Sequence, residues 1–105
     1  MVEVTFTFDV NPAIDQESYS RLSRKATAMM LHAEGFIELR ANRNLLGSPH
    51  VRRSSLWESM AHWAAFAEDP EFQKVTHEFR KYVTHMNVNL WGPSPYVLEP
   101  IRPEK

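Results

Sequence analysis

Residues 2–10 read VEVTFTFDV, so apolar and polar side chains alternate without interruption. Successive side chains of a β-strand point to opposite faces of a sheet, and such a stretch buries one face and exposes the other. Asn11 and Pro12 follow, and proline cannot donate to the hydrogen-bond ladder of a sheet. The stretch therefore predicts a strand at 2–10 with one apolar face.

A helix is predicted next, at about 16–34. Its apolar residues recur at spacings of three and four, which is typical of an amphipathic helix: Tyr19, Leu22, Ala26, Met29, Met30 and Ala33. Asp15 is a suitable N-cap residue. Gly35 can adopt the left-handed conformation that often ends a helix.

Two strands, at 36–43 and 51–58, are predicted to form a hairpin. In the first strand, Ile37, Leu39 and Ala41 are expected on one face. The intervening segment contains Gly47-Ser48-Pro49, which favours a turn.

The C-terminal part predicts helices and one more strand. Ser59 is expected to cap a short helix, and Asp69-Pro70 has the residue types that begin a second one. Apolar residues continue at helical spacing to about residue 87: Phe72, Val75, Phe79, Tyr82, Val83 and Met86. Gly92, Pro93 and Pro95 are expected to separate this helix from a short final strand at 96–101.

The predicted order of elements is β-α-β-β-α-β, which is typical of an α+β ferredoxin-like fold. It implies an antiparallel four-stranded sheet with the helices on one face, in a single domain over residues 1–105. The open face is expected to pack against a second copy of the chain, because two helices cover only one side of such a sheet. The sequence therefore predicts a homodimer.

Composition excludes several classes of protein. The 12 basic and 13 acidic residues give a net charge of −1, so no affinity for nucleic acid or for an anionic membrane is expected. The chain has no cysteine, which excludes disulfides, thiolate nucleophiles and cysteine-ligated metals. The alternating N-terminus does not resemble a signal peptide, and no segment has the length of a membrane span. A cytoplasmic location is expected.

Residues 35–72 carry a more specific pattern. Gly35-Phe36 follows the first helix, Leu56-Trp57-Glu58-Ser59 ends the hairpin, Trp63 comes six residues after Trp57, and Asp69-Pro70-Glu71-Phe72 begins the next helix. This pattern resembles the antibiotic biosynthesis monooxygenase family of the dimeric α/β-barrel superfamily. The order of elements extends the resemblance over most of the chain.

The resemblance implies a dimeric α/β barrel and a particular chemistry. Well-studied members work without metal or flavin, and bind a phenolic substrate between sheet and helices. Polar side chains favour the deprotonated substrate, which passes an electron to dioxygen. Related proteins also include heme-degrading enzymes, isomerases and proteins without known activity, so the fold alone does not select the reaction.

Three candidate catalytic residues follow from the resemblance. Trp57 matches a strand-end tryptophan whose indole N–H can donate to a substrate oxygen. Trp63 stands where some members carry tyrosine, and supplies an aromatic wall. Arg53 stands where anthrone-oxidising members have asparagine, and its guanidinium can stabilise a phenolate or accept a more acidic substrate.

The candidate substrate-binding residues are Phe6, Phe8, Phe66, Thr76 and Phe79. Phe8, Phe66 and Thr76 correspond to the asparagine, tryptophan and iron-binding histidine of the heme-degrading relatives. His77 is one residue out of step with that histidine and is expected to face solvent. The resemblance thus implies no cofactor, with heme left open.

No metal site is predicted, because the histidines lack the spacing of metal ligands. Two functions remain: a cofactor-independent monooxygenase acting on a hydroxylated aromatic, quinol or anthrone-like substrate, and a non-oxygenase barrel that binds a small aromatic or lipophilic ligand. Arg53 discriminates between them. An enclosed cavity around its side chain favours the enzyme, and a carboxylate pair at the subunit seam favours the binding protein.

Overall fold

A computed structural model describes residues 1–104. In this range the chain forms four strands and three helices in the order β-α-β-β-α-α-β. The strands are β1 (Val2–Val10), β2 (Phe36–Arg43), β3 (Val51–Trp57) and β4 (Val83–Trp91). The helices are α1 (Gln16–Leu31), α2 (Met60–Ala67) and α3 (Pro70–Phe79).

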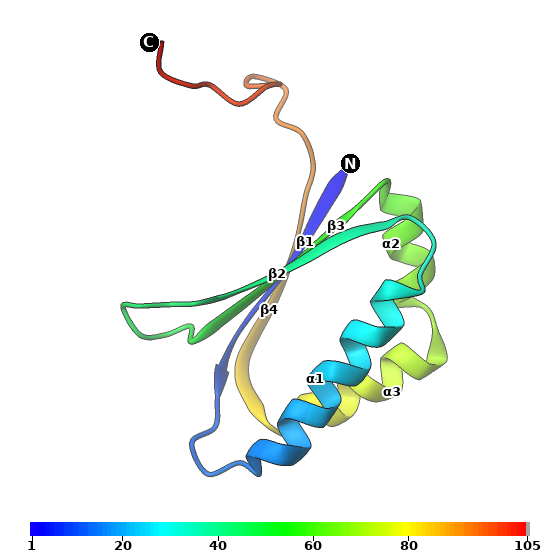
Figure 1. The fold of residues 1–105 in the computed structure, drawn as a ribbon, viewed down its shortest axis with the longest axis vertical. Helices are drawn as coiled ribbons and strands as arrows, with labels where there is room; N and C mark the ends of the chain where they lie inside the picture. The colour runs from blue at the N-terminus through cyan, green and yellow to red at the C-terminus, as the bar shows by residue number, and fades with distance from the viewer. Residues whose placement is uncertain (105) are drawn as a thin grey trace.

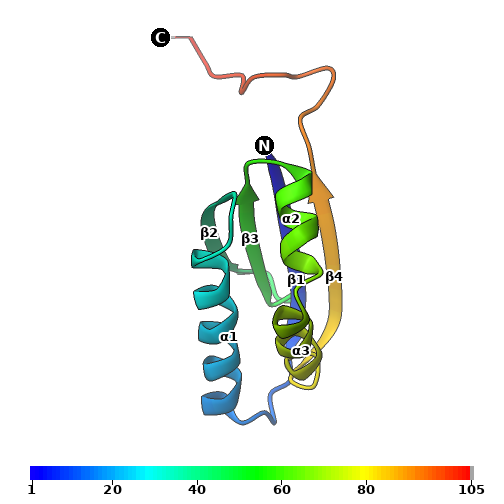
Figure 2. The ribbon, with the colours of Figure 1, turned by 90° about the vertical axis from the view of Figure 1, so that its right-hand side faces the viewer.

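The strands form one antiparallel sheet in the order β2-β3-β1-β4. All three helices lie on the same face of this sheet, with α1 beside the pair formed by α2 and α3 (Figure 1 and Figure 2). This arrangement confirms the predicted ferredoxin-like α+β fold. Within residues 1–104, no helix or strand covers the other face of the sheet (Figure 1).

The helix starts follow the predicted caps. The Asp15 side chain accepts hydrogen bonds from the N–H groups of Glu17 and Ser18, and Asp69 accepts one from Glu71. Ser59 caps α2 through the N–H of His62. Each cap satisfies N–H groups that have no partner within the helix.

The C-terminal prediction was wrong in two places. Helix α3 ends at Phe79 instead of residue 87, and the last strand lies at 83–91 instead of 96–101. The helical spacing of Tyr82, Val83 and Met86 was coincidental, because these residues belong to the turn before β4 and to β4 itself. β4 pairs with β1 along nearly its whole length, which satisfies the backbone groups that face β1. The residues after β4 run away from the sheet and helices (Figure 1).

Two boundaries differ more modestly from the prediction. Helix α1 ends at Leu31, three residues early, and Gly35 has its left-handed backbone (φ 83°) in the turn before β2. The register of β2 against β3 shifts between Phe36 and Glu38. This bulge turns Phe36 toward the core together with Leu39, while Ile37 is exposed.

The core consists of two adjoining clusters between sheet and helices. One is centred on Trp57 and Val4, and the other on Phe8, Phe79 and Val83. The apolar face of β1 contributes to both, as its alternation predicts. The space between the clusters is where a cavity forms.

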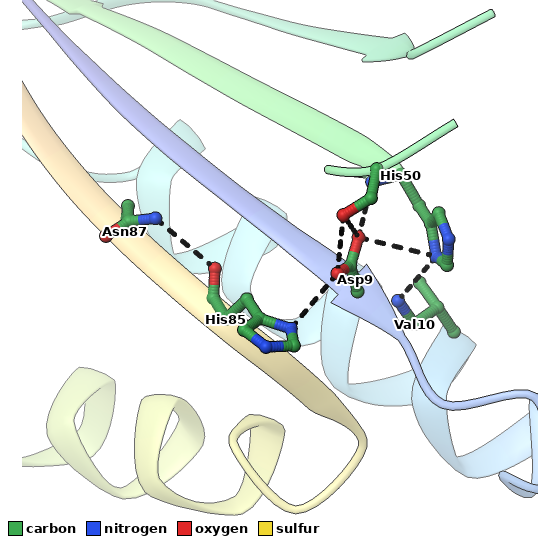
Figure 3. Close-up of polar contacts among 6 residues, drawn as sticks. Asp9, Val10, His50, His85 and Asn87 are labelled. Carbon is green, nitrogen blue, oxygen red and sulfur yellow. Dashed lines mark hydrogen bonds and ion pairs between the residues drawn. The ribbon is translucent and has the colours of Figure 1, made fainter. Parts of the chain in front are cut away.

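A polar cluster ties the tip of the β2–β3 hairpin to the end of β1 (Figure 3). The Asp9 carboxylate accepts hydrogen bonds from the Ser48 hydroxyl at 2.7 Å and the His50 N–H at 3.0 Å. His85 Nδ1 lies 3.1 Å from the same carboxylate, and His85 has a left-handed backbone (φ 56°) next to a bulge in the β1–β4 register. The hydrogen bond from Ser48, with further help from His50 and His85, lowers the pKa of Asp9 below its usual 3.8.

We expect Asp9→Asn to destabilise the protein at neutral pH and to have little effect in acid. A carboxyl group whose pKa is lowered by folding stabilises the fold above its unfolded-state pKa. That contribution is lost as the pH falls through the lowered value. Thermal unfolding of both proteins between about pH 2 and pH 7 measures this difference. Glu3→Gln, an exposed change on the same strand, is the control, and a melting-point gap that stays constant down to the lowest pH would count against the role of Asp9.

Candidate functional site

A cavity of about 40 Å³ lies between the sheet and helices α1 and α3. Strands β1, β3 and β4 line its sheet side, and the neighbouring helices α1 and α3 line its other side. Its lining is mostly apolar: Phe6, Phe8, Ser23, Ala26, Met30, Arg53, Phe72, Val75, Thr76, Phe79 and Met86. It has room for a few water molecules, so a ring can enter only if flexible side chains such as Met30 and Met86 move.

Arg53 is the one charged residue of this lining. Strand alternation directs it to the helix-covered face, where its guanidinium reaches helix α1. It donates to the Ser23 hydroxyl at 2.7 Å and to the Thr27 hydroxyl at 2.9 Å. Thr27 in turn donates to the Ser23 carbonyl at 2.9 Å, which leaves its oxygen free to accept from Arg53.

Burial changes the titration of the two ionisable groups here. It lowers the pKa of Arg53, although nearby Tyr19 opposes that shift, and it raises the pKa of Tyr19, whose rise Arg53 opposes. A guanidinium keeps its proton at neutral pH even when its pKa is lowered. The cavity therefore contains a fixed positive charge.

A second, larger depression of about 340 Å³ opens beside the cavity. Its lining includes Trp63 of α2, His77 and Arg80 near the end of α3, and Val88 of β4. Phe6, Phe72 and Thr76 line both this groove and the cavity. These three side chains thus form the partition between an outer groove and an inner, charged cavity.

The structure brings together five of the eight residues predicted for the site. Phe6, Phe8, Arg53, Thr76 and Phe79 all line the cavity. Trp63 lies in the outer groove, with its ring centroid 6.0 Å from that of Phe6. His77 is exposed on the groove wall, as its helical position predicts.

Trp57 and Phe66 lie elsewhere, which corrects the predicted geometry. Trp57 is completely buried, its indole N–H donates to the Ser55 hydroxyl at 2.9 Å, and it is not part of the cavity lining. Phe66 packs on Trp57 with a centroid distance of 5.1 Å. Both support the cavity wall from behind because Trp63 and Phe72 pack on this pair.

Sequence reasoning missed Ser23 and Thr27, the residues that hold Arg53. Their spacing of four places them on the same side of α1, next to the apolar stripe. The available signal was the presence of two hydroxyl residues beside the apolar stripe of the helix, because that side of the helix packs on the sheet face that holds Arg53. Among residues 1–104 there is no cluster of three or more histidine and acidic side chains arranged to hold a metal ion, and no helix is long and apolar enough to cross a membrane.

Comparison with known proteins gives one family. The model of the antibiotic biosynthesis monooxygenase family matches residues 1–78. No curated protein matches the sequence. The identities to solved structures are so low that those structures compare the fold alone.

Solved structures with this fold come from distant organisms. One is a variant of SnoaB, a cofactor-independent oxygenase from Streptomyces nogalater, with 14% identity, a TM-score of 0.77 and coverage of 93% of this chain and 97% of that one. A protein of Arabidopsis thaliana has 14% identity, a TM-score of 0.76 and coverages of 90% and 96%. A conserved protein from Methanosarcina mazei has 13% identity, a TM-score of 0.75 and coverages of 86% and 89%.

Proposed function

The chain belongs to the antibiotic biosynthesis monooxygenase family, and from this premise we propose that it is a cofactor-independent monooxygenase. Its proposed substrate is a hydroxylated aromatic, a quinol or an anthrone-like compound. The observation that carries the proposal is the position of Arg53. Its guanidinium lines an apolar cavity, is hydrogen-bonded to α1, and pairs with no acid among the residues that the structure describes.

The shape of the site supports a flat substrate. The outer groove offers an open approach, and Phe6 and Phe72 separate it from the cavity. Displacement of these rings and of Met30 and Met86 joins the two spaces into one slot. Aromatic walls of this kind hold a ring by stacking and edge contacts.

Arg53 has a chemical role in this proposal. A cation beside an apolar cavity favours the deprotonated form of a phenol or enol, because its charge is screened less there than in water. Thr76 of α3, which also lines the cavity, is the second polar contact. Trp63 forms the wall of the entrance, and Trp57 positions the core behind it.

The reaction is balanced without an external reductant. The substrate loses a proton, and its anion transfers one electron to dioxygen, which gives a substrate radical and superoxide. These combine to form a carbon–oxygen bond, and protonation gives a hydroperoxide. Loss of water from a carbon that carried two hydrogens leaves a carbonyl, so R₂CH₂ and O₂ give R₂C=O and H₂O.

We also propose that the protein forms a homodimer through the open face of its sheet. On the open face, Trp91 of β4 lies opposite Glu3 and stays half exposed. The chain after β4 exposes further large apolar side chains: Tyr96, Val97, Leu98 and Ile101. A second copy is the simplest cover for them. Sedimentation equilibrium at micromolar concentration is expected to give twice the mass of one chain, and a folded monomer would refute this part of the proposal.

Oxygen uptake by chelator-treated protein, with a panel of quinols and anthrones, tests the activity. We expect Arg53→Met to lower kcat/KM by about tenfold to a hundredfold, the value of a hydrogen bond to a charged group. Arg52→Met is the matched control. Arg52 lies on the opposite face of β3, where it donates to Asn42 at 3.1 Å.

The outcomes separate the two hypotheses. Uptake that depends on Arg53 and not on Arg52 supports the monooxygenase. Ligand binding without substrate-dependent oxygen uptake would establish the alternative, a barrel that binds a small aromatic or lipophilic molecule. Equal activity in both variants would refute the assigned role of Arg53.

A further inference from the structure

Arg53 has more hydrogen-bonding capacity than the protein uses. A guanidinium carries five N–H donors in a planar fork. Two of its donations are made, to the hydroxyls of Ser23 and Thr27. Both of these partners are neutral, so they orient the guanidinium without neutralising its charge.

The charge of Arg53 also lacks a counterion within the described residues. The ion pairs there join other groups, on the helix surfaces, on β2 and around Asp9. The other side chains that line the cavity, including Phe8, Val75 and Met86, carry no charge. Arg53 is partly buried. Removing a cation completely from water costs several kcal/mol in order-of-magnitude terms, so even partial burial favours an anionic partner.

A second copy of the chain is not a source of the missing anion. Arg53 points to the helix-covered side of the sheet, and the proposed dimer contact uses the other side. On β3, the residues next to Arg53 in sequence, such as Arg52, are the ones whose side chains point to the open face. An anion that pairs with Arg53 therefore has to enter through the cavity.

We propose that the ligand of this site is an aromatic anion whose oxygen group, a carboxylate or a phenolate, pairs with Arg53. The aromatic ring of this ligand follows from the proposed function, and its negative charge is the new element. The planar fork of Arg53 matches two oxygens of a carboxylate or one phenolate oxygen with a neighbouring acceptor. Ser23 and Thr27 are positioning residues that hold the fork toward the cavity.

Calorimetric titration under nitrogen tests the charge separately from turnover. The carboxylate arm compares salicylate with salicylamide, and the phenolate arm compares 4-nitrophenolate with 4-nitroanisole. Each pair shares a ring and differs in charge. We expect the anion of at least one pair to bind the unmodified protein about tenfold more tightly than its neutral partner, or better. The arm that shows this preference identifies the oxygen group.

Three variants locate the preference. Arg53→Met is expected to abolish it, Arg53→Lys to retain part of it because the charge remains, and Arg52→Met to leave it unchanged. Ser23→Ala with Thr27→Val is expected to weaken anion binding without removing the preference. If Arg53→Met does not fold, Arg53→Lys still tests the inference, because a partly retained preference for the anion is expected only if the charge at this position binds it.

Equal binding of charged and neutral partners in both arms, no binding in either arm, or loss of the preference in Arg52→Met would overturn the inference. Its failure is distinct from failure of the proposed function. Anion-selective binding without oxygen uptake refutes only the oxygenase. Oxygen uptake with neutral quinols in a protein without anion preference refutes only the charge assignment.

Discussion

Replacing Trp57 by alanine is expected to lower the free energy of unfolding by about 3–5 kcal/mol, the usual loss for a fully buried aromatic side chain. Trp57 has no exposed surface, and its ring contacts Phe36, Trp63 and Phe66 at centroid distances of 5.1–5.6 Å. The change also leaves the buried Ser55 hydroxyl without its donor. Urea unfolding followed by circular dichroism measures the loss.

Trp57→Phe is the matched control for this effect. It keeps most of the ring contacts and removes the indole N–H, so we expect a loss of about 1–2 kcal/mol. If Trp57→Ala costs less than about 1 kcal/mol, the tryptophan is not the centre of the core and the positions of the cavity walls are wrong.

Gly35→Ala is the second large effect, with an expected loss of about 2–4 kcal/mol. Gly35 has φ 83°, and an added Cβ would lie 2.2 Å from Cγ of His62. The backbone cannot shift easily because the Gly35 carbonyl accepts a hydrogen bond from Glu58 at 2.8 Å. His62 would have to leave the Ser59 hydroxyl, which lies 2.7 Å from its Nδ1.

The other two glycines separate the causes of this loss. Gly47 has φ 117° but open space around it, so Gly47→Ala reports the backbone cost of about 1 kcal/mol alone. Gly92 has neither a left-handed backbone nor a close neighbour, and Gly92→Ala is expected to change stability by less than about 0.5 kcal/mol. An equal effect for Gly35→Ala and Gly47→Ala in chemical denaturation would contradict the close packing of His62.

Most of the fold was predictable from local patterns. The alternation of residues 2–10 predicted β1, one of the two inner strands. Asp15, Ser59 and Asp69 marked the starts of α1, α2 and α3, because capping is a local interaction. The last strand was predicted at 96–101 instead of 83–91. Val83 and Met86 fit the helical spacing of α3, whereas the alternation of Met86, Val88 and Leu90 with Asn87 and Asn89 was the correct signal.

The site was predictable to a smaller extent, because it depends on contacts between distant segments. Strand alternation placed Arg53 on the correct face, and Phe6, Phe8, Thr76 and Phe79 followed as its surroundings. The hydroxyls of Ser23 and Thr27 are 30 and 26 residues away in sequence, and no local pattern links them to Arg53. Trp57 has the residue type of a donor, but Ser55, two residues earlier on the same face, takes its N–H.

We propose that this chain inserts oxygen from dioxygen into an aromatic substrate without a bound cofactor. Mass spectrometry of the product formed under ¹⁸O₂, with metal-free and flavin-free protein, tests it most directly. The account predicts one ¹⁸O atom in the product formed by the unmodified protein and by Arg52→Met, and much slower formation of that product by Arg53→Met. A product whose new oxygen comes from water, or turnover that begins only when iron, heme or flavin is added, would contradict it.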